Sequence, residues 1–271
     1  MNRGNATKIV SLLLMILTVV MAAGNVQPTL AGNASAPSVG QNLPSGVVFQ
    51  TANETNAHSA SITVTLPKVP KQGDALVGAI SLPTIGPIAP TVTGVVEGKA
   101  KWYRATAKMS ASRDEDVELW YTLKVDHSPK LVNVTFELSN DFSIGTLAVV
   151  VEFTNIAGTN ALQNTGSAQG DCASTCTIAS GTTGKTSSPN ELAIAFLGNN
   201  FMAASKSGQW NGSPSNGFKV LGTPFSKEGA EYDSKIVATL QKVTTSDTFV
   251  DSSPFDWCGV VATFLTFQTA S

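Results

Sequence analysis

The chain has 271 residues, of which 42% are hydrophobic and 13% are charged, and its formal net charge is -2. The charged fraction is about half of that in an average globular protein. The polar residues are mainly Ser, Thr, Asn and Gly, which are typical of strand-rich surfaces, whereas helical surfaces usually carry Glu, Lys and Arg. No block of Lys or Arg occurs, which argues against nucleic acid as a partner.

The N-terminal stretch has the pattern of an export signal. Arg3 and Lys8 precede an apolar run over residues 9–23, the arrangement of a secretory signal peptide. We therefore predict a signal peptide over residues 1–31 and a flexible lead-in over 32–46. The alternative is an uncleaved N-terminal anchor, although the run is shorter than the roughly 20 residues of a spanning helix. The expected location is extracellular or at the cell surface, with membrane contact only through an uncleaved leader.

The first half of the remaining chain is expected to form a series of strands. Residues 61–66 alternate apolar and polar, so one face is buried, whereas residues 74–82 are apolar on both faces. Residues 116–125 and 131–138 flank a turn-rich segment and are interpreted as a hairpin. The strands predicted in this half cover residues 47–51, 61–66, 74–82, 101–107, 116–125, 131–138 and 145–153.

The same order of segments recurs in the second half. Asp74 and Glu191 lie 117 positions apart, Glu118 and Glu231 lie 113 apart, and Val149 and Val261 lie 112 apart. This drifting offset indicates a duplication with insertions and deletions in loops. The strands predicted here cover residues 175–179, 191–197, 217–221, 230–240 and 257–267, with residues 155–169 as a crossover loop.

Roughly twelve short strands without a convincing amphipathic helix predict an all-β fold. We expect a single large β-sandwich of jelly-roll type over residues 47–271, built from two pseudo-repeated halves at about 47–156 and 170–271. Two small sandwiches in series are the alternative.

Four short motifs in a fixed order carry a resemblance to a known family. They are Gly-Asp-Ala-Leu-Val at 73–77, Val-Glu-Leu-Trp-Tyr at 117–121, Asn-Glu-Leu-Ala-Ile at 190–194, and Asp256-Trp257 followed by Val-Ala-Thr-Phe at 261–264. The set, which spans about residues 47–268, resembles a β-sandwich module of secreted bacterial surface proteins and phage tail proteins. The resemblance implies an extracellular, non-catalytic module and brings no catalytic residues with it.

The cysteines point to a disulfide rather than to a metal. Cys172 and Cys176 lie in one predicted loop, and in an exported protein they favour a local disulfide. Both are outside the family pattern. Cys258 is left over beside a predicted buried strand, where we expect a buried thiol. The two histidines, His58 and His127, lie in distant loops and do not complete a zinc site.

The carboxylates allow two readings. Asp114, Glu115 and Asp116 are consecutive, and oxygen ligands this close suit Ca²⁺, although a solvated charge run is the plainer alternative. No other cofactor is expected. One interpretation of Glu118 and Glu231 is the acid pair of a glycosidase, but their matching places in the two halves favour a packing role.

Three aromatic residues are candidates for ligand binding. Trp210 lies in a Gly- and Ser-rich stretch with nothing nearby to bury it, and Trp102 and Tyr103 stand together before a predicted strand. Exposed rings of this kind stack on sugars or dock protein partners. For Trp210 the alternative is a ring folded back onto the rim of the sandwich.

Two further patterns are weak. Residues 179–186 fit a relaxed phosphate-loop pattern, but a strand instead of a helix is expected to follow, which argues against nucleotide binding. Asn-X-Ser/Thr sequons, which a glycosylating host would modify, occur after the leader. They are at Asn33, Asn53, Asn133 and Asn211.

These features predict an exported, non-enzymatic β-sandwich that acts as a binding, adhesion or structural module at the cell surface. The expected partner is a surface glycan or a protein. One alternative is a filament subunit whose segment 33–59 adds a strand to a neighbouring copy. The other is a carbohydrate-active enzyme with unrecognised acidic residues.

Overall fold

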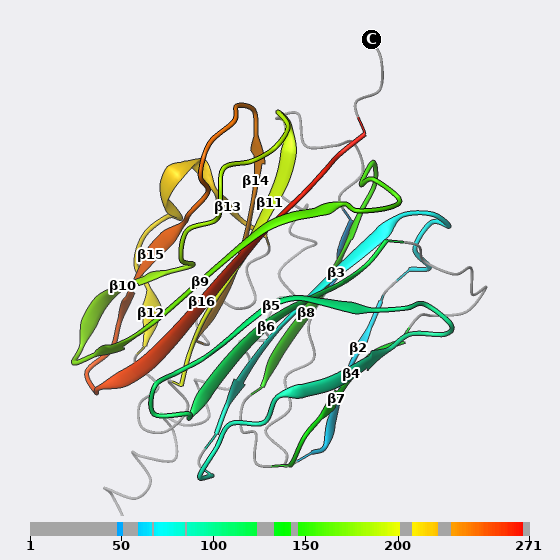
Figure 1. The fold of residues 1–271 in the computed structure, drawn as a ribbon. Helices are drawn as coiled ribbons and strands as arrows, with labels where there is room; N and C mark the ends of the chain where they lie inside the picture. Colours follow the sequence, from blue (N-terminus) through cyan, green and yellow to red (C-terminus); the bar gives the residue numbers. More distant parts are fainter. Residues whose placement is uncertain are drawn as a thin grey trace, which may run out of the picture. The chain divides into compact units, whose positions relative to one another are not determined.

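A computed structural model describes residues 48–50, 59–66, 68–84, 86–123, 133–141, 146–200, 208–221 and 229–267. All of them belong to the compact unit Gly40–Ser271, which is drawn in Figure 1. The predicted leader and lead-in lie outside the described residues, as do Asn33, Asn53 and both histidines.

The described residues form strands and the segments that connect them, and their helical structure is limited to the 3-10 turn Ser215–Gly217. The strands are β1 (Val48–Gln50), β2 (Ser61–Thr65), β3 (Ala75–Pro83), β4 (Val92–Val96), β5 (Tyr103–Met109), β6 (Glu115–Thr122), β7 (Asn133–Leu138), β8 (Leu147–Phe153), β9 (Leu162–Cys172), β10 (Thr175–Ala179), β11 (Glu191–Asn199), β12 (Gln209–Trp210), β13 (Lys219–Val220), β14 (Ala230–Val237), β15 (Ser246–Val250) and β16 (Phe255–Phe264). The predicted all-β class is confirmed.

The strands make four sheets, two of five strands and two of three. The first half supplies the order β1-β8-β3-β6-β5 and the small sheet β2-β7-β4. The second half supplies β9-β16-β11-β14-β13 and the small sheet β10-β15-β12. Adding eight to each strand number of the first half gives the strand numbers of the second, so both halves of the chain have one strand order.

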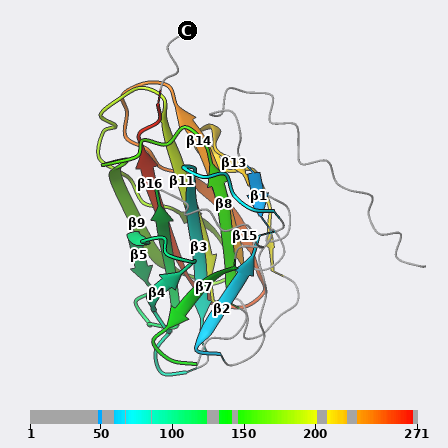
Figure 2. The same ribbon diagram turned by 90° about the vertical axis from the view of Figure 1, so that its right-hand side faces the viewer.

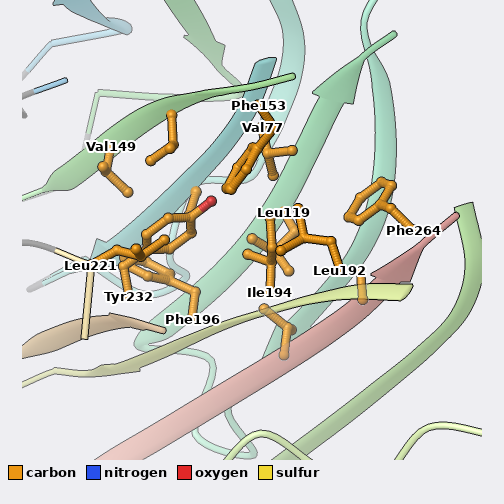
Figure 3. Close-up of a cluster of buried hydrophobic side chains, with 14 of the residues drawn as sticks. Val77, Leu119, Val149, Phe153, Leu192, Ile194, Phe196, Leu221, Tyr232 and Phe264 are labelled. Carbon is orange, nitrogen blue, oxygen red and sulfur yellow. The ribbon is translucent and has the colours of Figure 1, made fainter. Parts of the chain in front are cut away.

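The two five-stranded sheets face each other across a shared apolar core. Val77, Leu119 and Val149 enter this core from the first half, and Ile194 and Phe196 enter it from the second. Figure 3 shows these side chains converging between the sheets. The interior that holds the two halves together is therefore built by both of them.

Each five-stranded sheet is also covered on its other face. Leu76 and Ile80 of β3 pack with Val64 and Phe136 of the sheet β2-β7-β4, which lies in front of the large sheet in Figure 2. In the second half, Leu197 packs against Ile178 and Phe249 of the small sheet β10-β15-β12, within a cluster shared with Phe255 and Cys172. The architecture is thus a set of antiparallel sheets packed face to face, which is consistent with the expected β-sandwich.

Burial on both faces explains the continuous apolar runs in the sequence. Along β8, Val149 and Val151 point to the central core, whereas Ala148 and Val150 point to the outer one. Side chains alternate between the faces of a strand, so a strand between two cores is mostly apolar on both faces. All nine residues of β3 and of β11 are accordingly buried.

Two details predicted from the sequence are wrong. The segments of the predicted hairpin form β6 and β7, but β6 pairs with β3 and β5, whereas β7 pairs with β2 and β4. A turn-rich connection does not determine its strands' partners when two sheets are available. The predicted crossover loop 155–169 contains most of β9, an eleven-residue strand paired with β16.

Strand β9 lacks a strand-like pattern because it lies at a sheet edge and contains glycines that permit close contacts. A Cβ at Gly170 would lie 2.7 Å from the indole of Trp257, so only glycine fits beneath that ring. Such a strand is stabilised by its pairing and not by its own residue preferences.

The cysteine predictions agree with the structure. Cys172 and Cys176 form a disulfide that closes the turn between β9 and β10. Cys258 is free and fully buried, and burial raises the pKa of its thiol far above the ordinary value.

The buried hydroxyl of Tyr232 gives a test of the central core. Tyr232 is 1% exposed, its ring packs edge-on against Phe196, and its hydroxyl has no hydrogen-bond partner among the described residues. Because an unsatisfied buried group costs about 1–3 kcal/mol, Tyr232→Phe should raise the free energy of unfolding by about 1 kcal/mol in urea denaturation. Tyr232→Leu, which also loses the ring contact, should lower it. A less stable Tyr232→Phe variant would show that the hydroxyl has a partner.

Candidate functional site

The structure separates the three predicted aromatic residues. Trp102 is 8% exposed and lies in the outer core of the first half. Trp210 belongs to β12, where it pairs with Phe249 of β15 and its ring packs edge-on at 5.2 Å. The expected loop position of Trp210 is therefore wrong, because its ring folds back onto the sandwich.

Tyr103 is the aromatic candidate that reaches the surface. It begins the edge strand β5 and is 44% exposed. Its ring stacks on Tyr121 at 5.7 Å, and the Lys101 ammonium lies 5.0 Å from its centroid. These intramolecular contacts engage part of the ring, so its exposed remainder offers a small contact surface.

The predicted calcium ligands do not converge. Glu115 Oε1 accepts a hydrogen bond from Ser81 Oγ of β3 at 2.6 Å and lies near Gly198 of β11. Asp116 is on the opposite face of β6, beside Glu118. Strand alternation thus divides Glu115 and Asp116 between two faces, so the three carboxylates do not lie on one face, and the calcium site stays a prediction.

Asp114 instead joins the two halves through hydrogen bonds. Its Oδ2 accepts from Asn200 Nδ2 at 2.6 Å, and Asn200 Oδ1 accepts from the Asp256 backbone N–H at 2.9 Å. The Ser112 hydroxyl contacts the carboxylates of both Asp114 and Asp256. We assign these residues a structural role between β6 and β16.

Glu118 is a buried carboxylate with several donors and one acidic neighbour, Asp116, whose pKa is raised to about 9 by burial and by Glu118. Its Oε1 accepts from the Val92 backbone N–H at 2.7 Å, and its Oε2 accepts from Trp120 Nε1 at 2.8 Å. Arg104 Nη1 lies 3.6 Å from Oε2. A buried charge is tolerated when it has this combination of donors and a cation.

Glu231 has two acidic neighbours, whereas Glu118 has one, Asp116. It lies on the same face of β14 as Asp233 and has side-chain contacts to Asp233 and to Asp247 of β15. Burial, and then the neighbouring carboxylates, raise the pKa of Glu231 to about 9. Burial and Asp247 likewise raise the pKa of Asp233 to about 8. Carboxyl groups this close share protons, so the cluster is partly protonated at neutral pH.

Glu118 and Glu231 occupy the same position in the two halves. Glu118 faces Ile80 in the β3–β6 register, and Glu231 faces Leu197 in the β11–β14 register. Ile80 and Leu197 lie 117 positions apart, as do Asp74 and Glu191.

The two glutamates point away from each other. The neighbours of Glu118 on β6 enter the central core, and so does Tyr232 beside Glu231, so each glutamate faces its own outer layer. The acid pair that the glycosidase alternative required is not formed across a cleft.

The segment resembling a phosphate loop is extended. The backbone N–H groups of Ser180, Thr183 and Thr186 donate to the carbonyls of 245, 243 and 241, each at 2.9 Å. Their hydroxyl oxygens accept from the N–H groups of the same three residues, each at 3.0 Å. We call this arrangement the hydroxyl clamp. Its three anchors are every third residue of 180–186, and they bind every second residue of 241–245.

Glycine is required within the clamp. Gly181 has φ +77, and a Cβ there would lie 2.4 Å from the backbone of Ser167. The glycine-rich pattern thus reflects close packing against β9 and not a phosphate cradle.

Beside the clamp lies a small cationic depression that the sequence did not reveal. Its cavity volume is about 200 Å³. It is lined by Asn216, Phe218, Lys235, Gln241, Lys242, Val243 and Thr244. The lining comes from the 3-10 turn, β14 and the clamped segment, three places that are unremarkable in sequence. The sequence offered one weak signal for this site: Lys235 and Lys242 are lysines in a chain with only 17 Lys and Arg residues.

No family model matches the chain, and a search of curated proteins finds no match to it. The described residues contain no group of three or more His, Cys, Asp or Glu placed to hold a metal ion. In the same residues, no helix has the length and apolar character to cross a bilayer.

The acidic cluster of the second half predicts a pH-dependent stability. The pKa values of Glu231 and Asp233 are raised in the folded state to about 9 and about 8, so folding favours their protonated forms. Stability should be greatest near pH 4 and fall as the pH rises towards 8–9, by up to about 1.4 kcal/mol per pH unit for each group.

Asp233→Asn, which mimics the protonated acid, should flatten this slope in thermal unfolding between pH 5 and 9. At pH 8 the variant should be more stable than the wild type, because the buried charge is gone. Asp141→Asn, which changes an exposed carboxylate, serves as the control. An identical pH slope in wild type and Asp233→Asn would contradict the assignment.

Proposed function

We propose that the chain is an exported, non-enzymatic module that binds or adheres at a cell surface. The strands act as a rigid frame in this proposal, and the surface segments between them meet the partner, a glycan or a protein. The module derives from one jelly-roll unit duplicated within the chain.

The observation that carries the proposal is the burial of Glu118 and Glu231 at one register position in each half. Their relative exposures are 0% and 2%, and each faces its own outer layer. Carboxylates that act on a sugar must flank the scissile bond, whereas these two serve packing. This favours a scaffold over a glycosidase.

The shared strand order supports the duplication. In a jelly roll, an eight-stranded unit divides its strands between two facing sheets. Eight strands in each half divide in the same way between a five-stranded and a three-stranded sheet. The recurrence of the whole order is simpler to explain by copying one unit than by two independent origins.

Two features support an extracellular location. The disulfide Cys172–Cys176 suits an oxidising compartment. The sequon residues Asn133 and Asn211 are both exposed, so glycans there would not disturb the cores.

Binding arrays separate the binding module from the enzyme. The purified mature protein, applied to immobilised surface glycans and extracellular proteins, should bind without cleaving a glycan. Glu118→Gln and Glu231→Gln should bind within about twofold of the wild type, since both side chains are away from solvent. Glycan hydrolysis that disappears in either variant would establish the enzyme instead.

A filament subunit is a second candidate, and one observation favours it. The described part of β1 pairs with β8 through three residues, Val48 to Gln50, whereas its counterpart β9 has ten register pairs with β16. A short edge strand can be exchanged between copies at little cost.

Strand exchange predicts assembly that depends on the N-terminal segment. If it occurs, light scattering should show oligomers that grow with concentration and disappear when residues 33–59 are deleted. Added peptide 33–59 should bind the truncated protein. A monodisperse full-length monomer at millimolar concentration would rule out the filament.

A further inference from the structure

The cationic depression in the second half has a fixed shape. Asn216, in the left-handed conformation with φ 56, donates from Nδ2 to the Thr244 carbonyl at 3.1 Å. Lys235 Nζ donates to the Asn216 carbonyl at 2.5 Å. On the other side, the hydroxyl clamp holds the backbone of Gln241 and Val243. Its walls are therefore tied to one another before any ligand arrives.

Positive charge gathers at this place. Lys235 and Lys242 both line the depression, and Lys242 faces Lys185 in an isolated antiparallel bridge. Like charges directly opposite each other are unfavourable. Lys242 is exposed, and the ammonium of the half-buried Lys235, which donates to the Asn216 carbonyl, has two further N–H groups.

The rest of the lining suits a ligand whose ring carries polar groups. Gln241 and Thr244 carry hydrogen-bonding side chains, and the buried residues Phe218 and Val243 form the apolar base. The cavity of about 200 Å³ equals roughly seven liquid water volumes of about 30 Å³. That space exceeds the need of a single small ion and fits much of one monosaccharide.

The first half lacks this chemistry at the matching position. Lys235 faces Ala193 in the β11–β14 register, and Thr122 faces Leu76 in the β3–β6 register. Leu76 and Ala193 are 117 positions apart, so Thr122 is the counterpart of Lys235. Thr122 is 1% exposed. The lysine is thus a feature of one half and is not needed by the shared frame.

We propose that this depression binds an acidic sugar residue, with the sugar carboxylate between Lys235 and Lys242 and the ring hydroxyls at Gln241 and Thr244. Charge-assisted hydrogen bonds to the carboxylate supply the selectivity over neutral sugars. The inference rests on the proposed binding role and names the ligand class of that role.

The test is a titration of the full mature protein followed by NMR chemical shifts at constant ionic strength. The probes are glucuronate, N-acetylneuraminate, glucose, glucose 6-sulfate and inorganic phosphate. One acidic sugar should bind saturably, with glucose at least about tenfold weaker. Lys235→Gln and Lys242→Gln should each weaken the acidic sugar about tenfold. Lys99→Gln, an exposed lysine of the first half, is the matched control and should leave affinity unchanged.

Several results would overturn the inference. They are equal binding of glucuronate and glucose, unchanged affinity in both pocket variants, or binding of the sulfate or phosphate probes alone. Thermal unfolding of each variant checks that a loss of affinity is not a loss of fold.

The array experiment keeps this inference separate from the proposed function. If the pocket variants still bind the surface ligand of the wild type, the module binds elsewhere and only the pocket assignment fails. If the wild type binds no glycan or protein, both fail.

Discussion

The structure depends on the apolar contact between the two five-stranded sheets. This contact buries the inner face of each sheet, and the small sheets bury much of the outer faces. Central strands such as β3 and β11 therefore meet core on both sides. Because burial of apolar area is the main favourable term in folding, neither half should fold well without the other. Contacts with ligands or partners therefore have to come from sheet edges and connecting segments.

Matching register positions in the two five-stranded sheets carry glutamates with different surroundings. Glu118 meets Arg104, an indole N–H and a backbone N–H, with Asp116 beside it. Glu231 meets Asp233 and Asp247. The backbone register fixes where each carboxyl group lies, whereas the neighbouring strands supply its donors or its acidic neighbours.

The sequence predicted the parts of the fold that strong periodicity determines. β3, β8, β11 and β16 were found because strands covered on both faces are mostly apolar along their length. β4, β9 and β12 were missed because edge strands take their conformation from pairing, as the Gly-containing β9 does, and β15 was missed because its sequence has no long apolar run. The predicted hairpin failed because sequence spacing does not choose between two sheets.

The candidate site was harder to predict than the fold. Trp102 and Trp210 looked like ligand contacts since their exposure depends on distant strands, and tertiary packing covers them. Lys235 and Lys242 escaped notice because two unrelated lysines become a site only when β14 and the clamped segment lie together. The consecutive acids at 114–116 suggested convergence, which the alternation of a strand prevents.

The hydroxyl clamp has a consequence for how this region can vary over evolution. Its three anchor points recur every third residue on one side and every second residue on the other. A residue inserted between 180 and 186 misaligns the later anchors with their partners. A change in length that keeps every anchor therefore needs three residues on this side together with two in 241–245, while the intervening side chains are free to change.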